Sequence, residues 1–184
     1  MRRYKSIVLS GYPASGKSAL AEQLSKRYGW PVYSMGGLWR KKYAELHPDG
    51  DITFEEFWGR TTPEDSRKMN EEAKKIFENG GVIGDSRYVS YLDGSLCLLV
   101  FVTAELGIRA QRVCDRDGYK GMSVDEIKRL LEKRENDEFN IGKGLFGMDY
   151  RDMRQYHIVI NSGKLTVAQE VDIIDRLMEG DQSK

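Results

Sequence analysis

A glycine-bounded loop near the start of the chain constrains the fold more than any other stretch. Residues 11–18 read Gly-Tyr-Pro-Ala-Ser-Gly-Lys-Ser, which matches the G-x-x-x-x-G-K-S pattern of a phosphate-binding loop. The apolar run 7–9 before it predicts a buried strand, and apolar residues at helical spacing follow over 19–27. A strand, a tight turn and a helix N-terminus direct backbone N–H groups at one point, where the helix dipole favours negative charge. The pattern therefore predicts binding of a nucleoside triphosphate.

The residue types in this loop suit phosphate chemistry. Gly11 and Gly16 let the backbone bend where a Cβ would clash. We expect Lys17 to reach the β- and γ-phosphates, and the Ser18 hydroxyl to ligate Mg²⁺. The predicted ATP-binding residues are this loop, its first helical neighbour and three residues farther along the chain: Gly11, Tyr12, Pro13, Ala14, Ser15, Gly16, Lys17, Ser18, Ala19, Arg112, Arg116 and Asn161.

Composition narrows the class of protein. The chain has 184 residues, 40% hydrophobic and 32% charged, which suits one globular domain with a sizeable core. Its 29 Lys and Arg balance 29 Asp and Glu, so bulk charge implies neither nucleic acid nor an anionic membrane as partner. We expect no signal peptide and no membrane span, because no apolar run approaches about 20 residues. Cys97 and Cys114 fit no metal or disulfide spacing, which favours reduced thiols and a cytoplasmic location.

Strand-like and helix-like segments alternate along the whole chain. Strands are predicted at 7–9, 31–34, 82–85, 96–102 and 157–161, and helices at 19–27, 38–46, 53–58, 63–79, 105–116, 123–138, 149–154 and 166–178. This alternation predicts an α/β chain with a three-layer P-loop NTPase fold and a five-stranded parallel sheet. The glycine-rich residues 140–147 are predicted to be mobile. Two stretches, about 35–80 and about 117–152, exceed what strand crossovers need and are predicted to cover the site.

Arginines follow the fourth predicted strand at helical spacing. Arg109, Arg112 and Arg116 lie three and four residues apart, and Arg134 follows on the next predicted helix. Phosphoryl transfer needs positive charge around the transferring oxygens rather than covalent help from the protein. The alternative is a solvated basic helix, but beside a phosphate loop we favour phosphate contacts for Arg112, Arg116 and Arg134.

Polar residues at two other strand ends predict a second substrate site. Asp85 ends a predicted strand, where it would hold Mg²⁺ directly or through water; a helix cap or a contact with the acceptor are alternatives. Arg87 follows in the same loop, and Arg40 projects from the opposite wall of the cleft. The predicted catalytic residues are Lys17, Arg87, Arg116 and Arg134; the acceptor-binding residues are Ser34, Gly36, Gly37, Arg40, Asp85 and Arg87; the metal ligands are Ser18 and Asp85.

Aromatic residues are concentrated in the first long excursion. Trp39, Phe54, Phe57 and Trp58 would either stack on a base or pack the small lobe that this excursion forms. Helical spacing favours packing.

Further motifs follow the phosphate loop in a fixed order: 34–40 (Ser-Met-Gly-Gly-Leu-Trp-Arg), 53–57 (Thr-Phe-Glu-Glu-Phe), 134–135 (Arg-Glu), 146–149 (Phe-Gly-Met-Asp) and 156–161 (Tyr-His-Ile-Val-Ile-Asn). Together with the arginines they resemble the nucleoside monophosphate kinase family, most closely the short cytidylate kinase type familiar from archaea. The resemblance covers nearly the full chain. It implies a single domain over 1–184, with a core over 1–34, 81–116 and 153–184, a helical acceptor-binding insert over about 35–80 and a lid over about 117–152.

The chain departs from this family's pattern at positions that bear on the acceptor. Asp85 replaces a glutamate, Ser66 and Asn70 replace an aspartate pair, and Ile141 falls where a lid arginine is expected, with Lys143 the nearest substitute. These changes affect acceptor recognition and lid charge more than ATP binding.

The resemblance implies transfer of the ATP γ-phosphoryl group to a nucleoside monophosphate, CMP or dCMP by preference, with ATP and Mg²⁺ as cofactors. It implies a small-molecule acceptor as partner, no nucleic acid or membrane, and a monomer or weak homodimer. Alternatives are a P-loop kinase of another small metabolite or nucleoside, and a non-catalytic ATP-binding regulatory module. The Asn-Lys-x-Asp signature is absent from the sequence, which argues against a GTPase.

Overall fold

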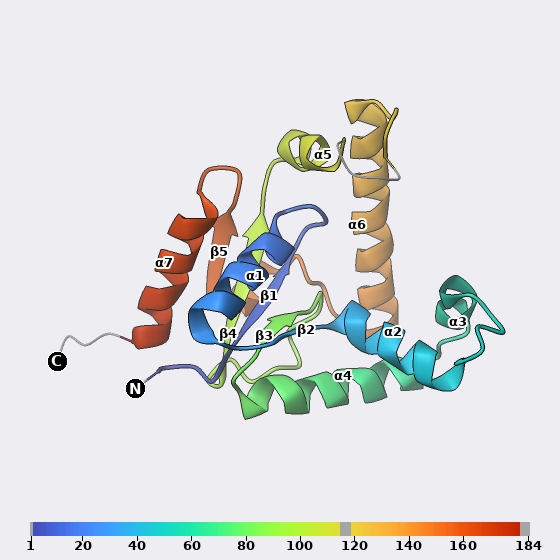
Figure 1. The fold of residues 1–184 in the computed structure, drawn as a ribbon, viewed down its shortest axis with the longest axis horizontal. Coiled ribbons are helices and arrows are strands. Elements are labelled where there is room, and N and C mark those ends of the chain that lie inside the picture. Colours follow the sequence, from blue (N-terminus) through green and yellow to red (C-terminus); the bar gives the residue numbers. More distant parts are fainter. Residues whose placement is uncertain (1, 115–118, 181–184) are drawn as a thin grey trace.

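A five-stranded parallel sheet forms the centre of the protein (Figure 1). The computed structural model describes residues 2–114 and 119–180. The strands lie in the order β2-β3-β1-β4-β5, and every neighbouring pair is parallel. Their bounds are β1 (Ser6–Gly11), β2 (Val32–Ser34), β3 (Ile83–Asp85), β4 (Cys97–Thr103) and β5 (Ile158–Asn161). The predicted parallel α/β sheet is confirmed.

Helices cover both faces of this sheet, which makes the three layers that the sequence predicts. Their bounds are α1 (Lys17–Tyr28), α2 (Met35–Leu46), α3 (Phe54–Gly59), α4 (Pro63–Asn79), α5 (Leu106–Cys114), α6 (Val124–Phe146) and α7 (Val167–Glu179), with a 3-10 turn η1 (Met153–Gln155). The alternation of side chains along β1 explains the layers. Ile7 and Leu9 pack in one buried cluster with α1 and α7, whereas Val8 packs in another with Phe77 of α4.

The first predicted excursion forms α2, α3 and α4. Helix α2 begins at the carboxyl end of β2, whereas α4 runs along the sheet to the start of β1, where the Ser6 hydroxyl donates to Phe77 O at 2.7 Å. In Figure 1, α6 stands beside the sheet, with α5 at its N-terminal end and α2 near its C-terminal end. Ser34 begins α2, because its side chain accepts a hydrogen bond from the backbone N–H of Gly37 at 2.9 Å, so this helix starts three residues before the predicted Leu38.

The prediction that residues 140–147 are mobile is wrong, because α6 continues through them to Phe146. Glycine is disfavoured inside a helix, but packing overrides that preference here. A Cβ at Gly142 would collide with the ring of Tyr88, so glycine lets the loop after β3 pack directly against the helix. The predicted helix over 149–154 is also wrong in extent, since only the 3-10 turn η1 forms there.

No helix in the described ranges is both long enough and apolar enough to span a membrane.

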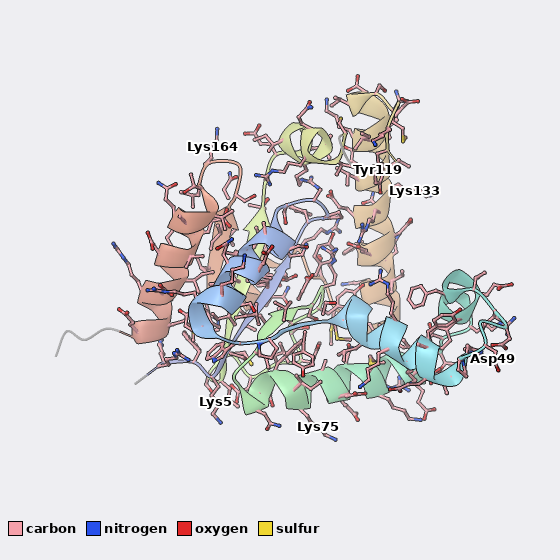
Figure 2. All side chains as sticks on the ribbon, viewed as in Figure 1. Lys5, Asp49, Lys75, Tyr119, Lys133 and Lys164 are labelled. Atoms are coloured by element: carbon pink, nitrogen blue, oxygen red, sulfur yellow. The ribbon has the colours of Figure 1, made fainter. Side chains whose placement is uncertain are left out.

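We predict that Phe77→Ala lowers the free energy of unfolding by about 3–5 kcal/mol, because it empties a fully buried site between α4 and the sheet. Lys75→Ala is the matched control on the same helix, since Lys75 points away from the sheet in Figure 2, and its effect should stay within about 0.5 kcal/mol. Urea unfolding followed by circular dichroism measures both. Equal losses would contradict the assignment of Phe77 to the core.

Candidate active site

The phosphate loop begins at the end of β1, where Gly11 lies directly against Val102 of β4. Gly11 ends β1 with a φ of 138°, and a Cβ there would collide with the carbonyl group of Val102. Gly16 then turns the chain into α1 with a φ of 95° and, as glycine, offers no capping side chain. The N–H groups of the first helical turn are therefore available to an anion.

Two residues inside the loop carry local features that suit a ligand site. Ala14 has a φ of 59°, and no other non-glycine residue in the described ranges has a positive φ. Backbone strain of this kind gathers at functional sites. Ser15 is fully buried, yet its hydroxyl has no hydrogen-bond partner among the described residues. An unpaired buried hydroxyl costs about 1–3 kcal/mol, which fits a loop shaped for a polar ligand.

Three cationic side chains contact the backbone carbonyl groups of this loop. Lys17 Nζ donates to Gly11 O at 3.2 Å and to Tyr12 O at 3.0 Å. Arg87 also donates to Gly11 O, through Nη1, and Arg109 donates to Pro13 O at 3.3 Å. Lys17 and Arg87, two of the predicted catalytic residues, therefore lie close together, because their side chains share one acceptor atom.

Lys17 lies in an unusual electrostatic environment. Burial and, next, the positive charge of Arg87 lower the pKa of Lys17 to about 7, while Asp85 and Glu138 act in the opposite direction. Arg134 contributes a further lowering. The charges that the sequence assigns to a second substrate site therefore act directly on the lysine of the phosphate loop.

A pocket of about 620 Å³ lies next to the loop. We call it the α2–α6 pocket, and its lining residues are Ser34, Met35, Gly36, Trp39, Arg40, Thr61, Ser66, Asn70, Asp85, Ser86, Arg87, Tyr88, Arg134, Glu138, Ile141 and Phe146. All predicted acceptor-binding residues except Gly37 line it, and Arg134 joins them. Gly37 does not line the pocket, but its N–H donates to the side chain of Ser34, which does. Besides Asp85, three positions depart from the family pattern. They also line this pocket: Ser66, Asn70 and Ile141.

The residues predicted to hold Mg²⁺ face a common space. Ser18 and Asp85 both line a hollow of about 340 Å³ beside α1 and β2. No group of three His, Cys, Asp or Glu in the described ranges is arranged to hold a metal ion. One hydroxyl and one carboxylate suit Mg²⁺, which keeps several waters and binds through few protein ligands plus substrate phosphates.

The two arginines of α5, Arg109 and Arg112, make different contacts. Arg109 is buried and held by Ala104 O at 2.8 Å, by Pro13 O and by an ion pair with Glu135 of α6. Arg112 lies beside Gly16 and donates to the hydroxyl and carbonyl oxygens of Ser162, at 2.9 and 2.8 Å. Arg116 lies outside the described residues.

Two further sequence predictions concern Asn161 and the aromatic residues. The side-chain oxygen of Asn161 accepts from Gly163 N at 3.0 Å and shapes the loop after β5. Trp39 and Phe57 are buried in a cluster with Met69, which favours the packing interpretation of the aromatic residues, although Trp39 also lines the pocket. The side chain of Trp58 lies outside the described residues.

Sequence reasoning missed Glu138, which contacts two of the predicted arginines. Its Oε1 accepts from Arg134 Nε and from Arg87 Nη2, each at 3.0 Å. The sequence signal that could have identified Glu138 is its four-residue spacing from Arg134, which places the two side chains on one helix face. Sequence reasoning also missed Tyr88, which lines the pocket directly after Arg87.

A parallel sheet in this order, with a phosphate loop after its central strand, defines the class of P-loop kinases. Solved structures share the fold: an uncharacterized protein from Eubacterium ventriosum has 19% identity and a TM-score of 0.69, covering 96% of this chain and 99% of that one. Shikimate kinase from Bacteroides thetaiotaomicron has 15% identity and a TM-score of 0.57, covering 93% and 98%. At these identities the likeness shows the fold alone.

The chain belongs to the cytidylate kinase-like family, whose model matches residues 6–164. Cytidylate kinase from Thermoplasma acidophilum is 29% identical over 162 residues, which is 85% of this chain and 82% of that protein. The family resemblance predicted from the motifs is confirmed.

We predict that ATP binding at pH 8 takes up about one proton, because Lys17 is mostly neutral above its pKa of about 7 and the phosphates favour its charged form. The affinity for ATP should therefore fall as pH rises above 7. Calorimetric titration in two buffers of different ionisation enthalpy measures the uptake. Lys17→Met should abolish it, and wild-type binding without proton uptake would contradict the electrostatic account.

Proposed function

We propose that the protein transfers the γ-phosphoryl group of ATP to the phosphate of a nucleoside monophosphate, CMP or dCMP by preference. The observation that supports this most strongly is the position of Arg87. One guanidinium contacts the phosphate loop at Gly11 O and also lines the α2–α6 pocket. A donor on the loop and an acceptor in the pocket would therefore meet at one cation.

In this proposal, the loop N–H groups, Lys17, Arg112 and Arg116 hold the donor phosphates, and Asn161 contacts the nucleoside part of ATP. Arg40 and Arg87 hold the acceptor's phosphate. An oxygen of that phosphate attacks the γ-phosphorus, the bond from this phosphorus to the β–γ bridging oxygen breaks, and ADP leaves with the electron pair. Arg87, Arg116 and Arg134 stabilise the charge on the transferring oxygens.

Ser18, together with Asp85 through water, would hold Mg²⁺. The ion would neutralise charge on the donor phosphates when bound.

The pocket has the dimensions and chemistry for a small phosphorylated acceptor. Its volume of about 620 Å³ falls within the range of small-molecule sites, about 300–1,000 Å³. Arg40, Arg87 and Arg134 supply positive charge, while Ser66 and Asn70 supply neutral hydrogen-bonding groups. An asparagine amide both donates and accepts, as a pyrimidine edge requires. Family membership and relatives named cytidylate kinase support a nucleotide as acceptor.

The proposal includes a cytoplasmic location and a monomer or weak homodimer. Both cysteines of the chain, Cys97 and Cys114, are free thiols, which suits a reducing compartment.

A turnover panel with ATP, Mg²⁺ and CMP, dCMP, UMP, AMP, shikimate or gluconate tests the proposed function. We expect the highest kcat/KM with CMP or dCMP and no transfer by Lys17→Met. Turnover of shikimate or gluconate alone would favour a metabolite kinase. Tight ATP binding without turnover of any acceptor would favour a regulatory module.

We predict that Arg40→Ala raises the KM for the acceptor about 10- to 100-fold, because it removes charge-assisted hydrogen bonds to the phosphate. The affinity for ATP should stay nearly unchanged. Lys41→Ala is the matched control on the same helix, since Lys41 is exposed and pairs only with Glu45 among the described ion pairs. Steady-state kinetics with each substrate varied in turn measures the two KM values. A selective loss of ATP binding would contradict the role of Arg40 in binding the acceptor.

A further inference from the structure

The carboxylate of Glu138 links two arginines inside the α2–α6 pocket. Arg87 approaches it with two nitrogens, Nη2 at 3.0 Å from Oε1 and Nε at 2.9 Å from Oε2. Arg134 donates to Oε1 at 3.0 Å from the same helix. The contact with Oε2 is an ion pair without hydrogen-bond alignment, so that buried oxygen has no hydrogen-bond partner among the described residues. Glu138 and Arg87 are only 20% and 17% exposed, so solvent screens this pair weakly.

The paired geometry between Arg87 and Glu138 is the one that a phosphate group also uses. A guanidinium presents its N–H groups as a planar fork that matches two oxygens of a carboxylate or of a phosphate. Arg87 already uses Nη1 on Gly11 O, and Glu138 faces Nε and Nη2. Glu138 occupies the fork formed by Nε and Nη2, so an acceptor's phosphate that binds Arg87 through this fork replaces the carboxylate.

The backbone of Glu138 is held in place independently of its carboxylate. The hydroxyl of Tyr88 donates to the backbone oxygen of Glu138 at 2.6 Å. One turn later, Gly142 gives the Tyr88 ring the space to pack against α6. Because these contacts involve the backbone and the tyrosine ring, they do not depend on the position of the carboxylate.

We propose that Glu138 is a specificity-determining residue, whose carboxylate competes with the acceptor's phosphate for Arg87 and Arg134. This inference rests on the proposed function, since it assigns these arginines to the acceptor. The competition weakens the binding of every anion at this position by the same factor. An acceptor that also contacts the distant part of the pocket, near Ser66 and Asn70, retains enough affinity to bind. A small inorganic anion lacks those contacts and is rejected.

A purely structural role for Glu138 predicts different behaviour, and Glu135 provides the comparison. Glu135 lies one turn earlier on α6 and forms an ion pair with buried Arg109, so it also fastens the helix to the core. It does not line the α2–α6 pocket. Removing its charge should lower stability without changing anion binding in the pocket.

The experiment compares sulfate binding to wild-type protein, Glu138→Gln, Glu138→Asp and Glu135→Gln. Isothermal titration is done with the phosphate loop filled by ADP and Mg²⁺. We expect Glu138→Gln to bind sulfate about tenfold more tightly, since a competing charge-assisted contact is removed. The sulfate affinity of Glu138→Asp, whose shorter carboxylate cannot reach both arginines as well, should lie between those of the wild type and Glu138→Gln. The sulfate affinity of Glu135→Gln should equal that of the wild type. Thermal unfolding verifies that each variant is folded.

The acceptor provides a second readout. Glu138→Gln should lower the KM for CMP by a similar factor, whereas a fastening role would lower stability and leave KM unchanged. Unchanged or weaker sulfate binding by folded Glu138→Gln would overturn the inference. If that variant does not fold, unchanged or weaker sulfate binding by Glu138→Asp would overturn it. If Glu138→Gln binds sulfate more tightly but the wild type does not turn over CMP, the proposed function is refuted and the competition stands. If the wild type turns over CMP but Glu138→Gln binds sulfate no more tightly, only the competition is refuted.

Discussion

The close contact between Gly11 and the backbone of Val102 sets the position of everything around the phosphate loop. Because only glycine fits there, β1 ends against β4, and Tyr12 N donates to Val102 O at 3.3 Å. The carbonyl oxygen of Gly11 is left facing the cations Lys17 and Arg87. One backbone atom thereby brings the lysine of the loop and the arginine of the α2–α6 pocket together, and the proposed transfer depends on that proximity.

Helix α6 connects the loop to the pocket through two parallel arginine contacts. Arg109 joins Pro13 O to Glu135, and Arg87 joins Gly11 O to Glu138, one turn farther along the helix. The first link is buried and serves to hold the loop and the helix together. The second link lies in the pocket, where we propose that an anionic ligand exchanges with the carboxylate. The two links have similar chemistry but different surroundings, since only the second lines the pocket.

The sequence predicted the features that depend on neighbouring residues. The phosphate loop, the strands and the start of α4 at Pro63 rest on local patterns, and the structure confirms the sheet. The end of α6 could not be predicted, because glycine disfavours a helix locally. Only the packing of Gly142 against Tyr88 explains why a glycine stands inside this helix. The burial of Arg109 depends on Glu135, a contact across 26 positions that helical spacing does not reveal. The pocket gathered most predicted acceptor residues, but the pairing of Glu138 with Arg87 depends on the way α6 docks.

The central claim is that the donor and acceptor phosphates bind side by side, on either side of Arg87. Its most direct test is calorimetric binding of an analogue that joins adenosine and cytidine through five phosphates. The account predicts that one molecule binds per chain, more tightly than ATP or CMP, and displaces both. An analogue that displaces ATP but leaves CMP bound would show that the two sites do not meet, and would contradict the account.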